Sequence, residues 1–115
     1  MNYQHKQLAS GKWFKLTFYE QMANIGSEVE RAILWREKNT QFSLKAIYRA
    51  LELLDLTISD TKNCVVSRLK ELCRLREILV DCFCFDNYYS STDEFWRKYF
   101  YPFYYAARKV TNKFM

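Results

Sequence analysis

Turn-forming residues are scarce in this chain of 115 residues, which contains two glycines and one proline. A many-stranded sheet needs a turn about every 8–12 residues, and glycine and proline make many of those turns. A few long helices with short polar links need far less turn chemistry. The sequence therefore predicts an all-α fold.

The first helix is predicted to begin at Thr17. Thr17 and Glu20 have the spacing of a capping box, in which each side chain satisfies a free backbone amide of the first turn. The apolar residues that follow recur with a period of about 3.6, which marks one buried helix face; they are Phe18, Met22, Ile25, Val29, Ala32 and Ile33. Gly26 lies on this helix, and we expect its missing side chain to let a neighbouring helix come close.

Three further helices are predicted from the polar links and apolar stripes that follow. Their expected bounds are about Thr40 to Ile58, Cys64 to Phe85, and Thr92 to Val110. A second capping box, Ser91 with Glu94, is expected to start the last of them. Four amphipathic helices with short links favour an up-and-down antiparallel four-helix bundle. A coiled-coil rod is the alternative, but it would need unbroken heptads.

The domain organisation follows from these bounds. Residues 17–110 form the bundle, 1–16 are a loose basic arm, and 111–115 are a short tail. Trp13, Phe14 and Leu16 are expected to tuck against the body of the bundle.

The net charge of +5 is modest, so it favours anionic partners without requiring them. No apolar run approaches the roughly 20 residues that span a bilayer, and the first residues lack the apolar core of a signal peptide. We expect a cytoplasmic protein that does not enter a membrane.

No catalytic motif or metal site is apparent. His5, the single histidine, lies in the arm, and the sequence contains no GxSxG, P-loop or GxGxxG motif. The four cysteines, at 64, 73, 82 and 84, lack CxxC spacing and are read as reduced thiols. Asp55 and Asp81 are expected to form ion pairs with arginines. We therefore expect no enzyme, cofactor, metal ion or small-molecule substrate.

The segment FWRKYFYPFYYAARK, residues 95–109, carries more aromatic side chains than one core face requires. At about 100° per residue, one side collects the expected core residues Phe95, Tyr99, Phe103, Ala106 and Val110, with Trp96 and Ala107 at its edge. The opposite side collects Arg97, Tyr101, Tyr104, Tyr105 and Arg108. Pro102 is expected to kink this helix.

The tyrosine and arginine residues of that outward side suit two kinds of partner. Both residue types are enriched at the centres of protein interfaces, and self-association is the simplest such case. They also suit nucleic acid, since guanidinium groups contact phosphates and phenol rings stack on bases. Membrane docking is disfavoured because the side lacks the apolar carpet of an interfacial helix.

A second basic feature lies in RLKELCRLR, residues 68–76. Arg68, Lys70, Arg74 and Arg76 could contact phosphates along this helix. The alternative is a solvated helix face in which Glu71 and Glu77 pair with the basic residues.

Several segments are similar to a group of small uncharacterised prokaryotic proteins: EQMANIGSEVERAI, RALELLDLTI, RLKELCRLRE, DNYYSSTDE and KYFYPFYYAAR. In size, charge and helical plan the chain also resembles two families of oligomeric bundles. One is encoded in intervening sequences of bacterial 23S ribosomal RNA genes. The other is the accessory variability determinant of diversity-generating retroelements, a nucleic-acid-binding partner of a reverse transcriptase. These resemblances imply an oligomeric bundle and assign no functional residue.

The function expected from the sequence is that of a non-enzymatic, oligomerising adaptor with a protein or nucleoprotein partner. A reverse-transcriptase accessory protein would be one such adaptor. The alternative is a stand-alone RNA- or DNA-binding protein, and an enzyme stands last.

Overall fold

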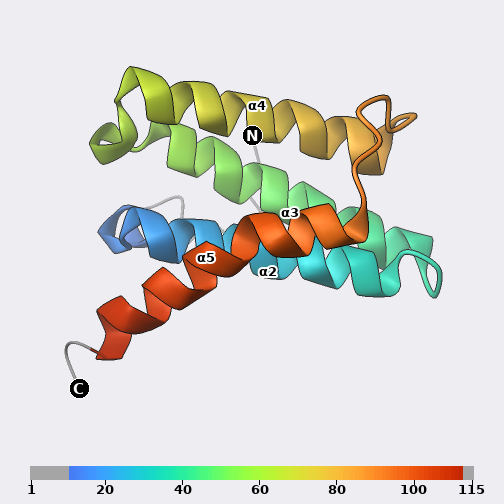
Figure 1. The fold of residues 1–115 in the computed structure, drawn as a ribbon, viewed down its shortest axis with the longest axis horizontal. Coiled ribbons are helices and arrows are strands. Elements are labelled where there is room, and N and C mark those ends of the chain that lie inside the picture. The colour runs from blue at the N-terminus through green and yellow to red at the C-terminus, as the bar shows by residue number, and fades with distance from the viewer. Residues whose placement is uncertain (1–10, 113–115) are drawn as a thin grey trace.

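The computed structural model describes the backbone of residues 11–112 and the side chains of residues 11–109. Most of the predicted arm, residues 1–10, and the end of the tail lie outside the described residues. Within the described part the elements are η1 (Lys12–Lys15), α2 (Phe18–Trp35), α3 (Thr40–Ser59), η2 (Thr61–Asn63), α4 (Val66–Cys84) and α5 (Asp93–Asn112). Successive α-helices alternate in direction (Figure 1), which confirms the predicted all-α up-and-down bundle.

The helix starts follow local capping chemistry. The Thr17 hydroxyl accepts from the Glu20 amide at 3.2 Å, and the Thr17 amide donates to the Glu20 carboxylate at 3.0 Å, so the first predicted capping box is confirmed. The second predicted capping box, Ser91 with Glu94, is wrong. The Thr92 hydroxyl caps α5 by accepting from the Phe95 amide at 3.0 Å. Since α5 begins at Asp93, the N-cap position is Thr92, and the Ser91 backbone instead bonds at both ends to the Asn87 side chain.

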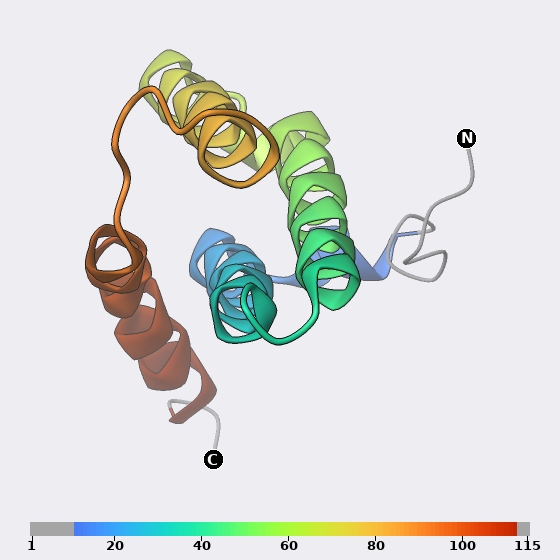
Figure 2. The same ribbon diagram turned by 90° about the vertical axis from the view of Figure 1, so that its right-hand side faces the viewer.

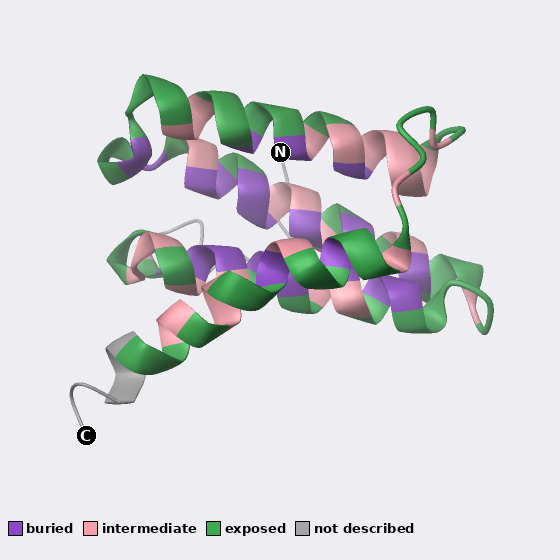
Figure 3. Ribbon diagram, viewed as in Figure 1, coloured by how far each residue is buried: buried purple, intermediate pink, exposed green. Residues whose placement is uncertain are grey.

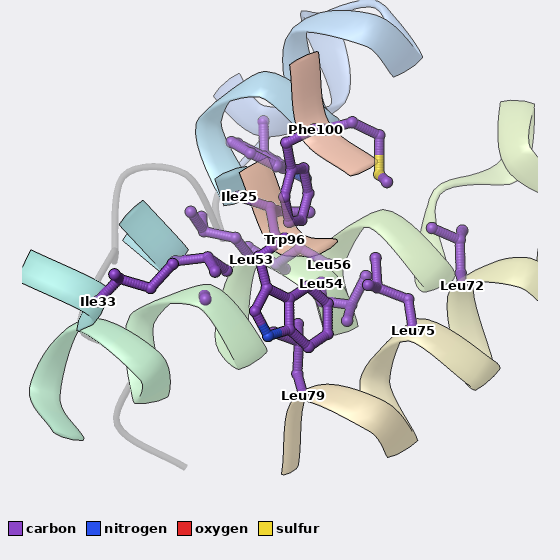
Figure 4. Packing of buried hydrophobic residues seen from close by; sticks show 14 residues of the cluster. Ile25, Ile33, Leu53, Leu54, Leu56, Leu72, Leu75, Leu79, Trp96 and Phe100 are labelled. Carbon is purple, nitrogen blue, oxygen red and sulfur yellow. The ribbon is translucent and has the colours of Figure 1, made fainter. Parts of the chain in front are cut away.

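Helix α2 lies at the centre of the bundle and packs against both α3 and α5, while α4 packs against α3 (Figure 2). The buried faces of all four α-helices point into one core (Figure 3). Trp96 and Phe100 from α5 reach inward toward Leu54, Leu75 and Leu79 of α3 and α4 (Figure 4). Two aromatic side chains therefore connect the last helix to the rest of the core.

The inward face of α5 differs from the predicted one. Trp96 and Phe100 are each 1% exposed, whereas Phe95, expected in the core, is 42% exposed. Tyr99 and Phe103 are partly buried at the edge of the core cluster. The helix is therefore rotated relative to the expected face, because its two fully buried side chains, Trp96 and Phe100, occupy the space between α2 and α4.

Gly26 of α2 permits this packing, as expected from the sequence. A Cβ atom at position 26 would lie 2.7 Å and 2.8 Å from two ring carbons of Phe100, and it would also meet the Tyr104 hydroxyl. Real Cβ atoms do not approach other heavy atoms that closely. Since the Phe100 ring is buried and cannot swing away, any larger residue would push α5 outward.

A buried polar network fastens η1 to the end of α3. Trp13 is 1% exposed, and its indole N–H donates to the Thr57 hydroxyl at 3.0 Å. The Gln21 amide donates to the Trp13 carbonyl at 3.1 Å and to the Asp60 carboxylate at 2.8 Å. Asn63 donates to the Gln21 side-chain oxygen at 3.0 Å. These groups satisfy one another, as buried polar groups must.

This network bears on the expected packing of Trp13, Phe14 and Leu16 against the body of the bundle. Trp13 is an integral part of the core and Leu16 packs against it, as expected. Phe14, expected to tuck in as well, is 39% exposed.

We predict that Gly26→Ala destabilises the protein. On an open helix surface this change would add about 1 kcal/mol of stability through helix propensity. Here the added methyl overlaps the Phe100 ring, and overpacking costs about 1–3 kcal/mol. Chemical denaturation should show a net loss in the free energy of unfolding. Ser27→Ala, at the exposed neighbouring position, is the control and should change it by less than about 0.5 kcal/mol. A more stable Gly26→Ala protein would contradict the close packing of α5.

We predict a pH-dependent contribution from Asp60. Burial alone would raise the pKa of Asp60, but hydrogen bonds from Lys62 and Gln21 outweigh it and lower that pKa from 3.8. A depressed folded-state pKa stabilises the protein above the unfolded value, and this contribution is lost as pH falls through the folded value. Asp60→Asn should therefore cost about 1–3 kcal/mol near neutral pH.

The difference between wild type and Asp60→Asn should shrink as the pH falls below 3.8. Urea denaturation as a function of pH measures it. Asp55→Asn, which removes one partner of an exposed ion pair with Arg76, is the matched control and should cost no more than about 1 kcal/mol. A constant difference for Asp60→Asn down to low pH would contradict the assigned role of its charge.

Candidate interaction surfaces

The outward side of α5 carries a continuous stripe of exposed side chains, Glu94, Lys98, Tyr101, Tyr105 and Arg108, which we call the α5 stripe. These residues follow one another at intervals of three or four, so they lie on one side of the helix. Tyr101 is 62% exposed and Tyr105 is 51% exposed. The stripe lies opposite Trp96 and Phe100, and the core therefore does not account for its tyrosines.

Arg97 borders the α5 stripe and is fixed in place by α2. Its Nε and one terminal nitrogen donate to the Glu30 carboxylate at 3.0–3.2 Å. These hydrogen bonds raise the pKa of Arg97. Glu30 fixes the orientation of the Arg97 guanidinium and occupies the N–H donors along one of its edges. Arg97 is therefore better suited to stacking on an aromatic ring than to binding a phosphate.

Tyr104 is not part of the outward surface, contrary to the prediction. It is half-buried against the core cluster and lies over Gly26. Burial raises the pKa of Tyr104 to about 12, with a smaller contribution from the charge of Glu30. The rotation of α5 that buries Phe100 also turns Tyr104 toward α2.

A pocket of about 180 Å³ adjoins the α5 stripe. Tyr101, Tyr104 and Arg97 line one side, and Glu30 and Ile33 of α2 line the other. Small-molecule sites usually span about 300–1,000 Å³, so this hollow has room for a single side chain rather than a cofactor.

The predicted basic face of α4 is only partly available. Arg68 lies over the Phe18 ring, 4.0 Å from its centroid, and donates to Asn63 at 3.3 Å. It is therefore engaged in holding α4 against the start of α2. Lys70 and Arg74 are exposed, and their role as phosphate contacts stays a prediction.

The acidic residues of α4 are bound to tyrosines. Glu71 accepts from Tyr99 at 2.8 Å, and Glu77 accepts from Tyr89 at 3.1 Å. Desolvation of Tyr99 raises its pKa, and the hydrogen bond to Glu71 raises it further. The expected ion pairs of these carboxylates with basic residues of α4 do not occur among residues 11–109.

A second groove, which the sequence did not suggest, lies where α2 ends and α3 begins. It measures about 230 Å³ and is lined by Arg31, Trp35, Phe42, Lys45 and Arg49. The Trp35 and Phe42 rings meet edge to face with centroids 5.3 Å apart. The sequence does contain a pattern that could have indicated this groove. Trp35 and Phe42 flank the polar link between the two helices, and Arg31 and Lys45 lie one helical turn away from them. We call this site the α2–α3 groove.

The acidic and cysteine side chains of the described residues do not gather into a metal site, and the two aspartates singled out from the sequence bind other residues. No group of three or more cysteine, aspartate, glutamate or histidine side chains within them is placed to hold a metal ion. Asp55 pairs with Arg76 at 2.7 Å, as expected. Asp81 accepts from the Tyr88 and Tyr89 amides at 2.7 Å and 3.0 Å, so it closes a loop rather than forming the expected ion pair.

Comparisons with family models, curated proteins and solved structures give no match for this chain. The resemblances suggested by the sequence therefore stay predictions, and a function can be inferred only from the surfaces of the bundle. Among the described residues, no helix has the length and apolar character needed to cross a bilayer.

We predict that two of the four thiols react quickly. Cys64 and Cys73 are exposed, while Cys82 and Cys84 are half-buried. Burial raises the pKa of the Cys82 and Cys84 thiols, which lowers their thiolate fraction. Titration with Ellman's reagent should show two fast and two slow equivalents. Cys64→Ser and Cys73→Ser should each remove one fast equivalent, and four equal rates would contradict the described burial.

Proposed function

We propose that this protein is a non-enzymatic cytoplasmic adaptor that self-associates through the α5 stripe. The observation that carries the proposal is the pair Tyr101 and Tyr105, which are more than half exposed on a helix whose core face is already complete. Tyrosine brings large contact area with a polar end and low entropic cost, which makes it frequent in protein interfaces. The unpaired cysteines favour a reducing compartment.

The charges along the α5 stripe favour a second copy of the same helix as the partner. Its first turn is acidic, with Asp93 and Glu94, and its last turn is basic, with Arg108 and Lys109 nearby. Two copies of α5 packed antiparallel would bring each acidic end against the other copy's basic end. A two-fold axis at Tyr101 places Glu94 opposite Arg108 of the second copy, since each lies seven residues from the axis.

The same register pairs aromatic with cationic side chains. Tyr105 and Arg97 are each four residues from Tyr101, so the Tyr105 ring of one copy faces the Arg97 guanidinium of the other. A guanidinium over an aromatic ring is an attractive contact. Within one copy, Lys109 already lies over the Tyr105 ring at 5.1 Å. The opposed helix dipoles of an antiparallel pair add to the attraction.

The exposed position of the helix end makes such a contact accessible. The C-terminal part of α5 diverges from the other helices and extends beyond the body of the bundle (Figure 1). Two copies could therefore pair their α5 helices without a clash between the bundle cores. A larger protein or nucleoprotein assembly, such as a reverse-transcriptase complex, would then meet a dimer rather than a single bundle.

Charge reversal tests the proposed register. Glu94→Arg and Arg108→Glu should each shift the sedimentation mass toward that of a monomer, because each places like charges opposite one another. The double variant Glu94→Arg/Arg108→Glu should restore self-association, since it exchanges the two charges across the axis. Sedimentation equilibrium at low salt measures all three, with circular dichroism to confirm unchanged helicity.

Two further variants complete the test. Tyr101→Glu/Tyr105→Glu should give a monomer, whereas Lys70→Glu on the exposed face of α4 should leave the mass unchanged. A wild-type protein that is monomeric at high concentration would overturn the proposal. Self-association that survives both tyrosine substitutions would also overturn it.

A further inference from the structure

The α2–α3 groove combines two features, exposed aromatic rings and cationic side chains. Trp35 is 38% exposed and Phe42 is 47% exposed, so both rings offer area to a ligand. Three cationic side chains line the same groove, Arg31, Lys45 and Arg49. We infer that this groove binds single-stranded nucleic acid, with one unpaired base on the Trp35–Phe42 pair and the adjoining phosphates on the three cations. This inference goes beyond the proposed function and uses none of the α5 residues.

The aromatic pair is suited to stacking. The two rings stand at 83° to each other, so a flat ligand that lies on the face of one ring meets the edge of the other. Bases stack on aromatic side chains with little regard to sequence, because every base has a π-face. Such a corner therefore favours an unpaired base over an aliphatic side chain of a protein partner.

Two of the three cations of the groove, Arg31 and Arg49, are positioned by a single carboxylate. Glu28 accepts from Arg31 at 2.9 Å and from Arg49 Nε at 3.0 Å. An arginine carries five N–H donors, so the terminal nitrogens of Arg49 keep donors for a phosphate. Lys45 completes the lining, and three cations with one carboxylate leave the site positively charged.

The start of α3 adds to the attraction for phosphate. The first turn of α3 contains no acidic residue, and Phe42 lies within that turn. A helix N-terminus carries a partial positive charge, and no carboxylate of its own first turn offsets that charge in α3.

The size of the groove argues for a chain-like ligand rather than an enclosed small molecule. Its volume of about 230 Å³ is below the roughly 300–1,000 Å³ of typical small-molecule sites. One base fits such a hollow, while the sugar–phosphate backbone continues across the surface. Duplex DNA or RNA does not fit this description, since its bases are already stacked and paired.

The tryptophans give a direct probe of this site. The chain has three, of which Trp13 and Trp96 are 1% exposed and Trp35 is 38% exposed. Quenching of tryptophan emission by a bound oligonucleotide therefore reports on Trp35. We expect a 12-nucleotide oligothymidylate or oligouridylate to quench this emission at low salt, and a duplex of the same length to do so far less.

Salt dependence and matched variants test the phosphate contacts. For three phosphates on a single strand, raising salt from about 50 to 200 mM should weaken binding about twenty-fold. Lys45→Gln should reduce both affinity and the salt slope. Lys15→Gln removes the same charge from an exposed position in η1, at the other end of α3, and should change affinity less than about two-fold.

Fluorescence anisotropy of a labelled oligothymidylate tests the stacking contact without relying on Trp35 emission. Trp35→Leu and Phe42→Leu should each weaken binding about ten-fold. Neither should affect an abasic strand of the same length, which retains the phosphates alone. Helicity measured by circular dichroism should stay unchanged in both variants because the two side chains are exposed.

The inference would be overturned by any of four results. The first is no binding of either single strand at low salt. The second is an equal loss for Lys45→Gln and Lys15→Gln, which would indicate diffuse attraction. The third is wild-type affinity in Trp35→Leu. The fourth is polyglutamate binding as tightly as the oligonucleotide. The monomeric Tyr101→Glu/Tyr105→Glu protein should still bind one base per copy, so a failure of self-association is distinguishable from a failure of this site.

Discussion

The close approach of α5 to α2 at Gly26 sets the arrangement on which the α5 stripe depends. With no side chain at Gly26, the Phe100 ring enters the space beside α2. Trp96, one turn earlier in α5, is buried on the same face of the helix. Burial of these two rings fixes the rotation of α5 about its axis. That rotation in turn leaves Tyr101 and Tyr105 facing outward and brings Tyr104 against the bundle.

Ion pairs bridge each pair of helices that pack closely. Glu28 and Arg49 join α2 to α3, Asp55 and Arg76 join α3 to α4, and Glu30 and Arg97 join α2 to α5. Exposed pairs of this kind contribute only about 0–1 kcal/mol each. Their larger effect is on the surface potential. Each ion pair neutralises an arginine that, from the net charge alone, would be counted as available to an anionic partner.

The helices could be predicted from the sequence because their signals are local. The apolar stripe of α2 and the Thr17 capping box depend on residues within a few positions of each other. The rotation of α5 could not be predicted in the same way. Aromatic residues occur all round this helix, so periodicity does not choose between Phe95 and Phe100, and the choice depends on the space that Gly26 leaves on another helix.

The candidate sites follow the same rule. Tyr101, Tyr105 and Arg108 were predicted to face outward and do so. The α2–α3 groove was missed because its lining comes from two helices whose relative placement is tertiary information. Arg68 was singled out for its charge, but its contacts with Phe18 and Asn63 are visible only once α4 has been placed beside α2.

The burial of Trp13 has a consequence for synthesis of the chain on the ribosome. Its indole donor has its partner in Thr57, 44 residues further along. At about 5–20 residues per second, translation takes roughly 2–9 seconds to cover that interval. During that time Trp13 is a large apolar side chain without its native contacts. The contacts of Trp13 and Gln21 are complete only when the chain up to Asn63 has been made, which sets the earliest moment at which this end of the core can become native.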